Sequence, residues 1–201
     1  MTGSAPGTVA YRDARAEDSR DIARLMCVAG GGLYEFLFDD LIPFVSAKDF
    51  LSVGIGGDSY PISHRHCRVA TEGDGGDVIG MANVFPADLL KGEDHHLLAS
   101  ERYAHIQPIM ELQDWGSLFL NALAVDERCR GRGVGDVLLR WAQDRAKSAG
   151  FNRLSLHVWA DNRPAMKFYR ARGYAEIGVA HIAPHPRLPH EGGSVLMHRA
   201  A

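Results

Sequence analysis

Residues 118–137 read LFLNALAVDERCRGRGVGDV, and this stretch decides the fold. The first eight residues are almost entirely apolar, which is typical of a central strand buried on both faces. A polar turn, residues 126–129, follows them. Alternating glycines then lead into a segment in which Val137 and Leu138 stand among apolar residues at helical spacing. The stretch therefore predicts a buried strand, a glycine-rich turn and a helix that opens at Gly133.

The glycine-rich turn is suited to binding an anion. Glycine lets the backbone adopt left-handed conformations and lets a ligand approach closely. Successive backbone N–H groups in such a turn can converge on an anion, and the positive end of the following helix adds to the attraction. Arg128, Arg130 and Arg132 can pair with outer phosphates through charge-assisted hydrogen bonds. We therefore expect a ligand that carries a pyrophosphate.

Two common nucleotide-binding motifs fit this turn poorly. The P-loop requires Gly-Lys followed by Ser or Thr, and that triplet does not occur here. The dinucleotide fingerprint requires a third glycine where the chain has Asp136. A glycine-rich turn that binds no ligand is the remaining structural alternative.

Further elements are predicted on both sides of this stretch. Toward the C-terminus we expect a strand at 154–159, a helix at 164–172 with Pro164 in its first turn, and two final strands at 174–182 and 195–198. Toward the N-terminus we expect a strand at 9–12, helices at 17–29, 33–41 and 47–53, and a hairpin at 68–85. A long insert at 86–114 should contain a helix at 97–112. This alternation indicates an α/β fold in which helices cover a mixed sheet.

Two motifs resemble a known family. Arg130-Gly131-Arg132-Gly133-Val134-Gly135 matches the Arg/Gln-x-x-Gly-x-Gly/Ala signature of the GNAT superfamily of acetyl-coenzyme A-dependent N-acetyltransferases. The segment from Asn162 to Tyr169, followed by Gly173-Tyr174, resembles that family's Asn-x-x-Ala-x-x-x-Tyr segment and its Gly-Phe/Tyr pair. The resemblance implies a mixed, largely antiparallel central sheet of about six or seven strands, splayed in the middle and flanked by helices.

The resemblance also implies where the coenzyme would bind. A central strand would hold the pantetheine arm, the glycine-rich turn would hold the pyrophosphate, and the second motif would line the other side of a splayed cleft. The residues that this assigns to the cofactor site are Leu123, Ala124, Val125, Arg130, Gly131, Arg132, Gly133, Val134, Gly135, Asp136, Asn162, Ala165 and Tyr169.

The implied reaction is direct attack of an amine of unknown identity on the thioester of acetyl-coenzyme A. Tyr169 matches the family's usual acid for the leaving thiolate, and a phenol with an ordinary pKa near 10 is protonated at neutral pH. A packing role for Tyr169 is the alternative, because Ala165, Phe168 and Tyr169 share one helical face. A non-catalytic domain that binds or senses acyl-coenzyme A is the alternative function.

The general base is left open. Glu111 and Asp114 precede the central strand, Glu35, Asp39 and Asp40 lie on the second predicted helix, and water could also carry the proton. The three carboxylates of that helix suggest a cationic amine as acceptor. The acceptor itself, a small-molecule or a peptide amine, and the length of the acyl chain are not fixed by the sequence.

We expect no metal, nucleic acid or membrane as partner. His64, His66 and Cys67 lack the paired spacing of zinc ligands, and the net charge of -3 does not favour nucleic acid. The apolar runs are shorter than the roughly 18 residues of a membrane span. The three scattered cysteines favour a reducing compartment, so we expect a cytoplasmic protein.

The expected organisation is simple. Residues 1–8 form a disordered lead, and residues 9–201 form a single N-acetyltransferase domain. The proline-rich segment at 183–193 either shapes the acceptor pocket or is a plain surface loop. A homodimer is left open.

Overall fold

The computed structural model describes residues 8–57, 61–91 and 100–201. Seven strands and six helices alternate along these residues: β1 (Val9–Asp13), α1 (Ser19–Gly30), α2 (Leu33–Phe38), α3 (Ala47–Gly56), β2 (Cys67–Glu72), β3 (Val78–Pro86), α4 (Ser100–Glu111), β4 (Leu118–Val125), α5 (Val134–Ser148), β5 (Arg153–Trp159), α6 (Arg163–Arg170), β6 (Ala175–Ala180) and β7 (Ser194–Ala200).

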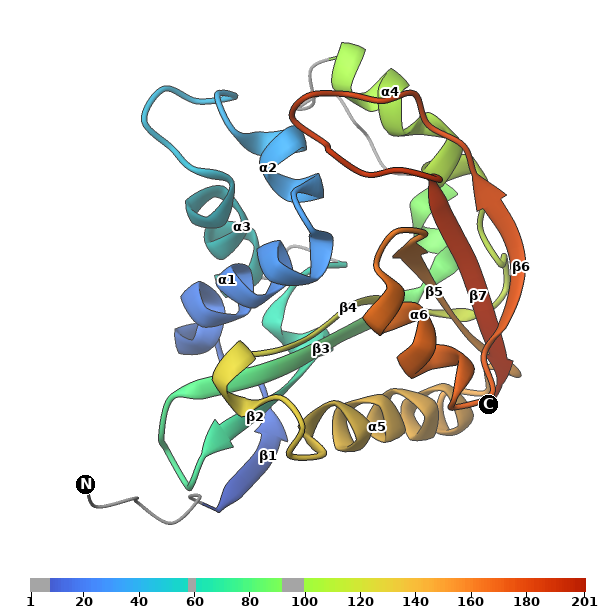
Figure 1. Cartoon of the computed structure of the whole chain (residues 1–201). Coiled ribbons are helices and arrows are strands. Elements are labelled where there is room, and N and C mark those ends of the chain that lie inside the picture. The colour runs from blue at the N-terminus through green and yellow to red at the C-terminus, as the bar shows by residue number, and fades with distance from the viewer. Residues whose placement is uncertain (1–7, 58–60, 92–99) are drawn as a thin grey trace.

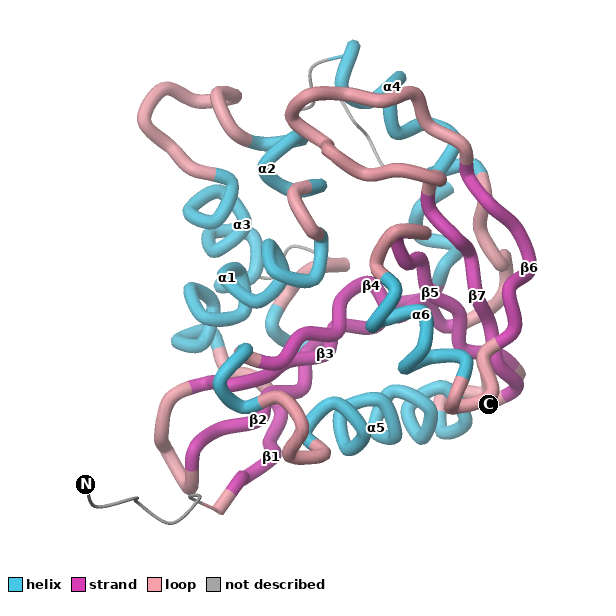
Figure 2. Tube along the Cα trace, viewed as in Figure 1, coloured by secondary structure: helices cyan, strands magenta, loops and turns pink. Residues whose placement is uncertain are grey.

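The strands form one sheet in the order β1-β2-β3-β4-β5-β7-β6. Only β4 and β5 run parallel, and every other neighbouring pair is antiparallel. Helices lie on both sides of this sheet, with α1 and α3 on one side of β3 and β4 and α5 on the other (Figure 1, Figure 2). The predicted mixed, largely antiparallel sheet with flanking helices is confirmed.

The hairpin between β2 and β3 follows from its turn residues. Gly73 and Gly75 both have positive φ, 67° and 81°, which glycine adopts without steric cost. The backbone N–H of Glu72 donates to the carbonyl of Asp77 at 3.0 Å and closes the turn. The hairpin predicted over residues 68–85 is therefore present, with residues 73–77 as its loop.

The two largest apolar cores hold α1 and α5 against the sheet. On one face Ile22, Leu25 and Met26 of α1 are completely buried against β2, β3 and β4. On the other face Leu138 and Leu139 of α5 pack with β4, β5 and α6. Each core gathers apolar positions spaced by one helical turn, so the sheet is covered on both sides.

The sheet is splayed at its centre, as the sequence predicts. β4 and β5 pair only where Leu118 meets Leu154 and Phe119 meets Ser155. At this base the hydroxyls of Ser117 and Ser155 lie 2.6 Å apart and are buried. Beyond it β4 remains paired with β3 alone, so its other edge is open over residues 120–125.

Some sequence predictions differ from the structure in detail. Val137 was expected on the inner face of α5, but its side chain is 37% exposed because the helix turns its buried stripe toward Val134 and Leu138. α2 ends at Phe38, before the predicted end at residue 41. Residues 1–7 of the predicted lead and residues 97–99 of the predicted insert helix lie outside the described residues.

No helix in the described ranges has the length and apolar character needed to cross a membrane.

Candidate active site

A cavity of about 590 Å³ lies along the open edge of β4. It is bounded by parts of α1, α2, α4, β5 and α6 and by the start of α5. Twelve of the residues assigned to the cofactor site from the sequence line it: Leu123, Ala124, Val125, Arg130, Gly131, Gly133, Val134, Gly135, Asp136, Asn162, Ala165 and Tyr169. Three segments that are separate in the sequence thus meet at one cavity.

The glycine-rich turn sits at one end of this cavity. Gly131 and Gly133 have φ of 75° and 78°, and a Cβ added to either would meet no atom within 4 Å. Glycine is therefore required there by backbone conformation and not by crowding. α5 begins at Val134, so the N–H groups of Val134 and Gly135 have no acceptor within the helix, whereas that of Asp136 donates to the carbonyl of Gly133 at 3.1 Å. This is the geometry that binds an anionic group.

The charged side chains around the turn have separate roles. Arg130 Nε donates to the carbonyl of Val125 at 3.2 Å and ties the turn to the end of β4. Asp136 would repel a phosphate, but Arg172 pairs with it at 2.5 Å. Arg132 is the one assigned residue that does not line the cavity, and its Nη1 lies 3.9 Å from Glu72.

The open edge of β4 extends from this turn toward the base of the splay. Six strand residues span about 20 Å. Because β5 does not pair with them, some of their backbone N–H and C=O groups face the cavity without a ladder partner. A thin ligand with amide groups of its own could satisfy them along its length.

Helix α6 forms the opposite wall. The side chain of Asn162 accepts a hydrogen bond from the backbone N–H of Ala165 at 3.2 Å and caps the helix. Two positions of the sequence motif therefore have a structural role as a helix cap in addition to lining the cavity.

Tyr169 packs in the apolar core and also lines the cavity, so the packing role is confirmed and the role as an acid stays a prediction. Its ring is 8% exposed and packs edge-on against Phe168 and Tyr174, so it belongs to the apolar core. It also lines the cavity. Burial is the main cause that raises its pKa above the ordinary value, so the phenol keeps its proton at neutral pH.

The far end of the cavity contains residues that the sequence reasoning did not assign. Its lining includes Gln113, two residues after the end of α4. It also includes residues of α2, β4 and β5 and the first residue of β7: Tyr34, Phe119, His157, Trp159 and Ser194. Alternation along β5 would have indicated that His157 and Trp159 share a face. No local signal would have brought Gln113 or Ser194 to the same place.

His157 is held as a neutral imidazole. Its Nε2 donates to the carbonyl of Leu112 at 2.8 Å, because a carbonyl can only accept. Its Nδ1 is then the acceptor for the hydroxyl of Ser194, 3.0 Å away. Burial lowers the pKa of His157 to about 4, and the hydrogen bond to Leu112 opposes this only in part.

None of the carboxylates considered as a general base lines the cavity. Asp114 pairs with Arg153 at 2.9 Å and with His198 at 2.9 Å. Glu111 accepts from Gln107 at 2.6 Å and is exposed.

The acidic residues on α2 and directly after it do not line the cavity either. Asp39 accepts the backbone N–H of Ala47 at 2.7 Å, and Asp40 pairs with Arg187 at 3.1 Å. Glu35 is half-buried, and one of its carboxylate oxygens is buried without a partner among the described residues.

The proline-rich segment packs beside the cavity through His190. Its Nε2 donates to the carbonyl of Gly31 at 2.6 Å, and its Nδ1 lies 3.0 Å from the carboxylate of Asp161. Its ring stacks on Trp159, whose Nε1 donates to the carbonyl of Gly30 at 2.8 Å. The segment thus links the turn between α1 and α2 to the end of β5.

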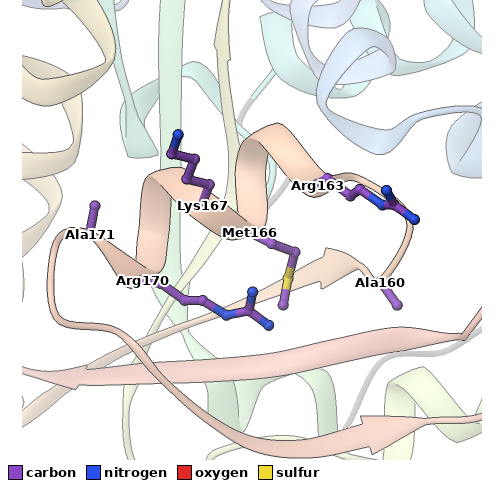
Figure 3. Close-up of a pocket in the computed structure, with 6 residues that line it drawn as sticks. All are labelled: Ala160, Arg163, Met166, Lys167, Arg170 and Ala171. Atoms are coloured by element: carbon purple, nitrogen blue, oxygen red, sulfur yellow. The ribbon is translucent and has the colours of Figure 1, made fainter.

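A second hollow, of about 660 Å³, lies against α6 (Figure 3). Its lining includes Arg163, Lys167 and Arg170, and Arg170 pairs with Glu176 on β6. None of the residues assigned to the cofactor from the sequence lines this hollow.

Within the described part of the chain, no group of three His, Cys, Asp or Glu side chains is arranged to hold a metal ion. His95 and His96, which are adjacent in the sequence, lie outside that part.

Comparison with known proteins gives consistent matches. The model of the "Acetyltransferase (GNAT) family" matches residues 55–174. A mycothiol acetyltransferase of Clavibacter sepedonicus is 29% identical over 164 residues, which is 82% of this chain and 49% of that protein. A crystal structure described as an acetyltransferase superposes with a TM-score of 0.67 and 26% identity, and covers 95% of this chain and 98% of that one.

An N-acetyltransferase structure from Staphylococcus aureus Mu50 superposes with a TM-score of 0.68 over 94% of this chain and 100% of that one. At 21% identity it supports the fold alone. The curated relatives that match first are aligned over only 36% to 49% of their own length.

Proposed function

Because the chain belongs to the acetyltransferase (GNAT) family and is an acyltransferase, we propose that it transfers an acetyl group from acetyl-coenzyme A to an amine. The observation that carries this proposal is the single cavity in which an open strand edge leads directly to a glycine-rich turn. The open edge of β4 suits the amides of a pantetheine arm. The turn and the start of α5 suit a pyrophosphate.

The residues of the chain have distinct tasks in this proposal. Backbone groups of Leu123, Ala124 and Val125 bind the pantetheine arm. Backbone groups from Arg130 to Asp136 bind the pyrophosphate. Asn162 and Ala165 complete the opposite wall. An N–H of the open β4 edge is suited to donate to the oxyanion that develops on the acetyl carbonyl.

The reaction forms an N–C bond and breaks a C–S bond. The amine loses a proton and the departing sulfur gains one. The phenol of Tyr169 carries a proton at neutral pH and can donate a hydrogen bond to that sulfur. Because its pKa is raised, full transfer to a thiolate of lower pKa is uphill, so the phenol first acts as a hydrogen-bond donor that stabilises the thiolate.

Calorimetric titration with acetyl-coenzyme A tests the proposal. We expect saturable binding. In a separate thermal-unfolding experiment the melting temperature should rise with ligand concentration, because bound ligand stabilises the folded state by about 2.7 kcal/mol at 100 times the dissociation constant. A thiol reagent should then report release of free coenzyme A when amines are added. A protein that binds acetyl-coenzyme A and releases no thiol with any amine would be a sensing domain. Absence of binding at millimolar ligand would exclude both functions.

A further inference from the structure

The charged side chains of the cavity are confined to one of its ends. Among the described residues that line it, the cationic and anionic side chains are Arg130, Asp136 and Arg172, all beside the glycine-rich turn. The end near Phe119 has no carboxylate and no cationic side chain in its described lining. In the proposed function the pyrophosphate lies at the turn and the pantetheine arm extends from it along β4, so the thioester and the amine acceptor lie toward this end.

The walls of this end are apolar or neutral. Aromatic and aliphatic side chains converge on it from α1, α2, α4, β4 and β5, with Tyr34, Phe119 and Trp159 as the largest. His157 is neutral and engaged through both ring nitrogens. A second positive charge on a bound amine would lose its hydration here and find no carboxylate in exchange.

Gln113 supplies an unused hydrogen-bond acceptor. Its side-chain Nε2 donates to the carbonyl of Ile109 at 2.7 Å, which fixes the orientation of the amide. Its Oε1 is then buried with no donor among the described residues. The residue is 9% exposed and lines the cavity. A buried amide oxygen without a donor is costly, and a ligand N–H is the group that would complete it.

An apolar end also favours the form of the amine that reacts. Desolvation disfavours the charged ammonium and lowers the pKa of an amine. The free amine, whose lone pair attacks the thioester, is therefore more populated than it would be beside a carboxylate. The whole cavity is about 590 Å³ and the pantetheine arm shares it, so the acceptor must be small.

We propose that the acceptor is a small primary amine whose body is aromatic or aliphatic and carries no second charged group, and that Gln113 Oε1 accepts a hydrogen bond from its amino group. This inference rests on the proposed acetyl transfer. It replaces the cationic amine suggested by the carboxylates of α2, none of which lines the cavity.

Matched pairs of amines test the substrate class. Benzylamine is compared with 4-(aminomethyl)benzylamine, and butylamine with 1,4-diaminobutane, by kcat/KM at fixed acetyl-coenzyme A. We expect each monoamine to be preferred at least about tenfold over the diamine. Preference for either diamine would overturn the inference.

Two variants at Met110, a half-buried residue of the cavity wall, test the role of charge. Met110→Glu adds a carboxylate, and Met110→Gln adds a neutral group of the same shape. We expect only Met110→Glu to gain activity with the diamines. Equal behaviour of the two variants would contradict the electrostatic argument.

The Gln113 contact is tested by Gln113→Met, with Gln107→Met on α4 as the control outside the cavity lining. We expect Gln113→Met to raise KM for the monoamines about tenfold while the dissociation constant of acetyl-coenzyme A is unchanged. An unchanged KM would remove Gln113 as a binding residue. If either variant unfolds, the wild-type amine pairs still decide the substrate class.

The two proposals fail in distinguishable ways. If acetyl-coenzyme A does not bind the wild-type protein, the proposed function is wrong. If it binds and the protein acetylates a diamine in preference to its matched monoamine, or acetylates peptides in preference to every monoamine, only the substrate class is wrong.

Discussion

The ring of His190 lies parallel to that of Trp159, with centroids 4.1 Å apart and planes 9° apart. Trp159 lines the cavity, and His190 belongs to the segment between β6 and β7. The same imidazole donates a hydrogen bond to the carbonyl of Gly31, which is distant in the sequence. The position of this cavity wall therefore depends on a contact between distant segments.

Replacing His190 by Ala should loosen that wall. The variant loses the ring stack and the hydrogen bond to Gly31, so we expect the free energy of unfolding to fall by about 1–2 kcal/mol. KM for the amine should rise, while binding of acetyl-coenzyme A at the glycine-rich turn should change little. Denaturant titration and steady-state kinetics measure both effects. His181→Ala, at an exposed position of the same segment, is the control.

Replacing Tyr169 by Phe separates its chemical role from its packing role. The substitution keeps the ring and removes only the hydroxyl. We expect kcat to fall at least about tenfold with little change in KM or melting temperature, if the phenol stabilises the departing thiolate. Unchanged kcat would assign Tyr169 to the core alone.

The glycine-rich turn offers a matched pair of identical substitutions. Gly131→Ala forces an L-residue into a φ of 75° and should destabilise the protein by about 1 kcal/mol. Gly135 does not have a positive φ, and an added Cβ would lie 3.6 Å from the ring of Phe168, an ordinary contact. Gly135→Ala should therefore leave the melting temperature nearly unchanged. If both variants lost the same stability, the positive φ would not explain why glycine is needed at position 131.

His157 should make stability depend on pH. Its pKa is lowered to about 4 in the folded protein and is near 6.5 when unfolded, so between these values the unfolded chain binds more protons. The free energy of unfolding should then fall as pH decreases from 6.5 to 4, by at most about 1.4 kcal/mol per pH unit from this group. Urea titrations at several pH values measure the slope. His157→Gln should reduce it, and a His157 NMR titration midpoint near 6.5 would contradict the assignment.

The sequence predicts best the part of the molecule in which each element has a strong local signal. The apolar run of β4, the glycines before α5 and the cap at Asn162 each specify their own conformation. The predicted cofactor lining lies on these elements, so most of it could be named in advance. The side chain of Arg132 does not line the cavity, because a turn points neighbouring side chains in different directions, and Arg130 is the one arginine of the motif that does.

The acceptor end could not be predicted in the same way. Gln113 and Ser194 come from segments far apart in the chain, and only tertiary packing joins them. The position of β7 between β5 and β6 was also not evident, because strand order depends on where a long connection returns. Asp39 and Asp40 are plausible general bases from their position in the sequence. In the structure they instead bind Ala47 on α3 and Arg187 in the segment between β6 and β7.

The short pairing of β4 with β5 has a consequence for self-association. An unpaired strand edge is normally a site where another chain can add a strand and start aggregation. Here the open edge lies inside the sheet, and α1, α2 and α6 border the cavity in front of it. A polypeptide strand needs a continuous partner edge and room for side chains on both faces. The enclosed edge instead admits a narrow, flexible molecule, so the protein can keep unpaired backbone groups available without offering them to its neighbours.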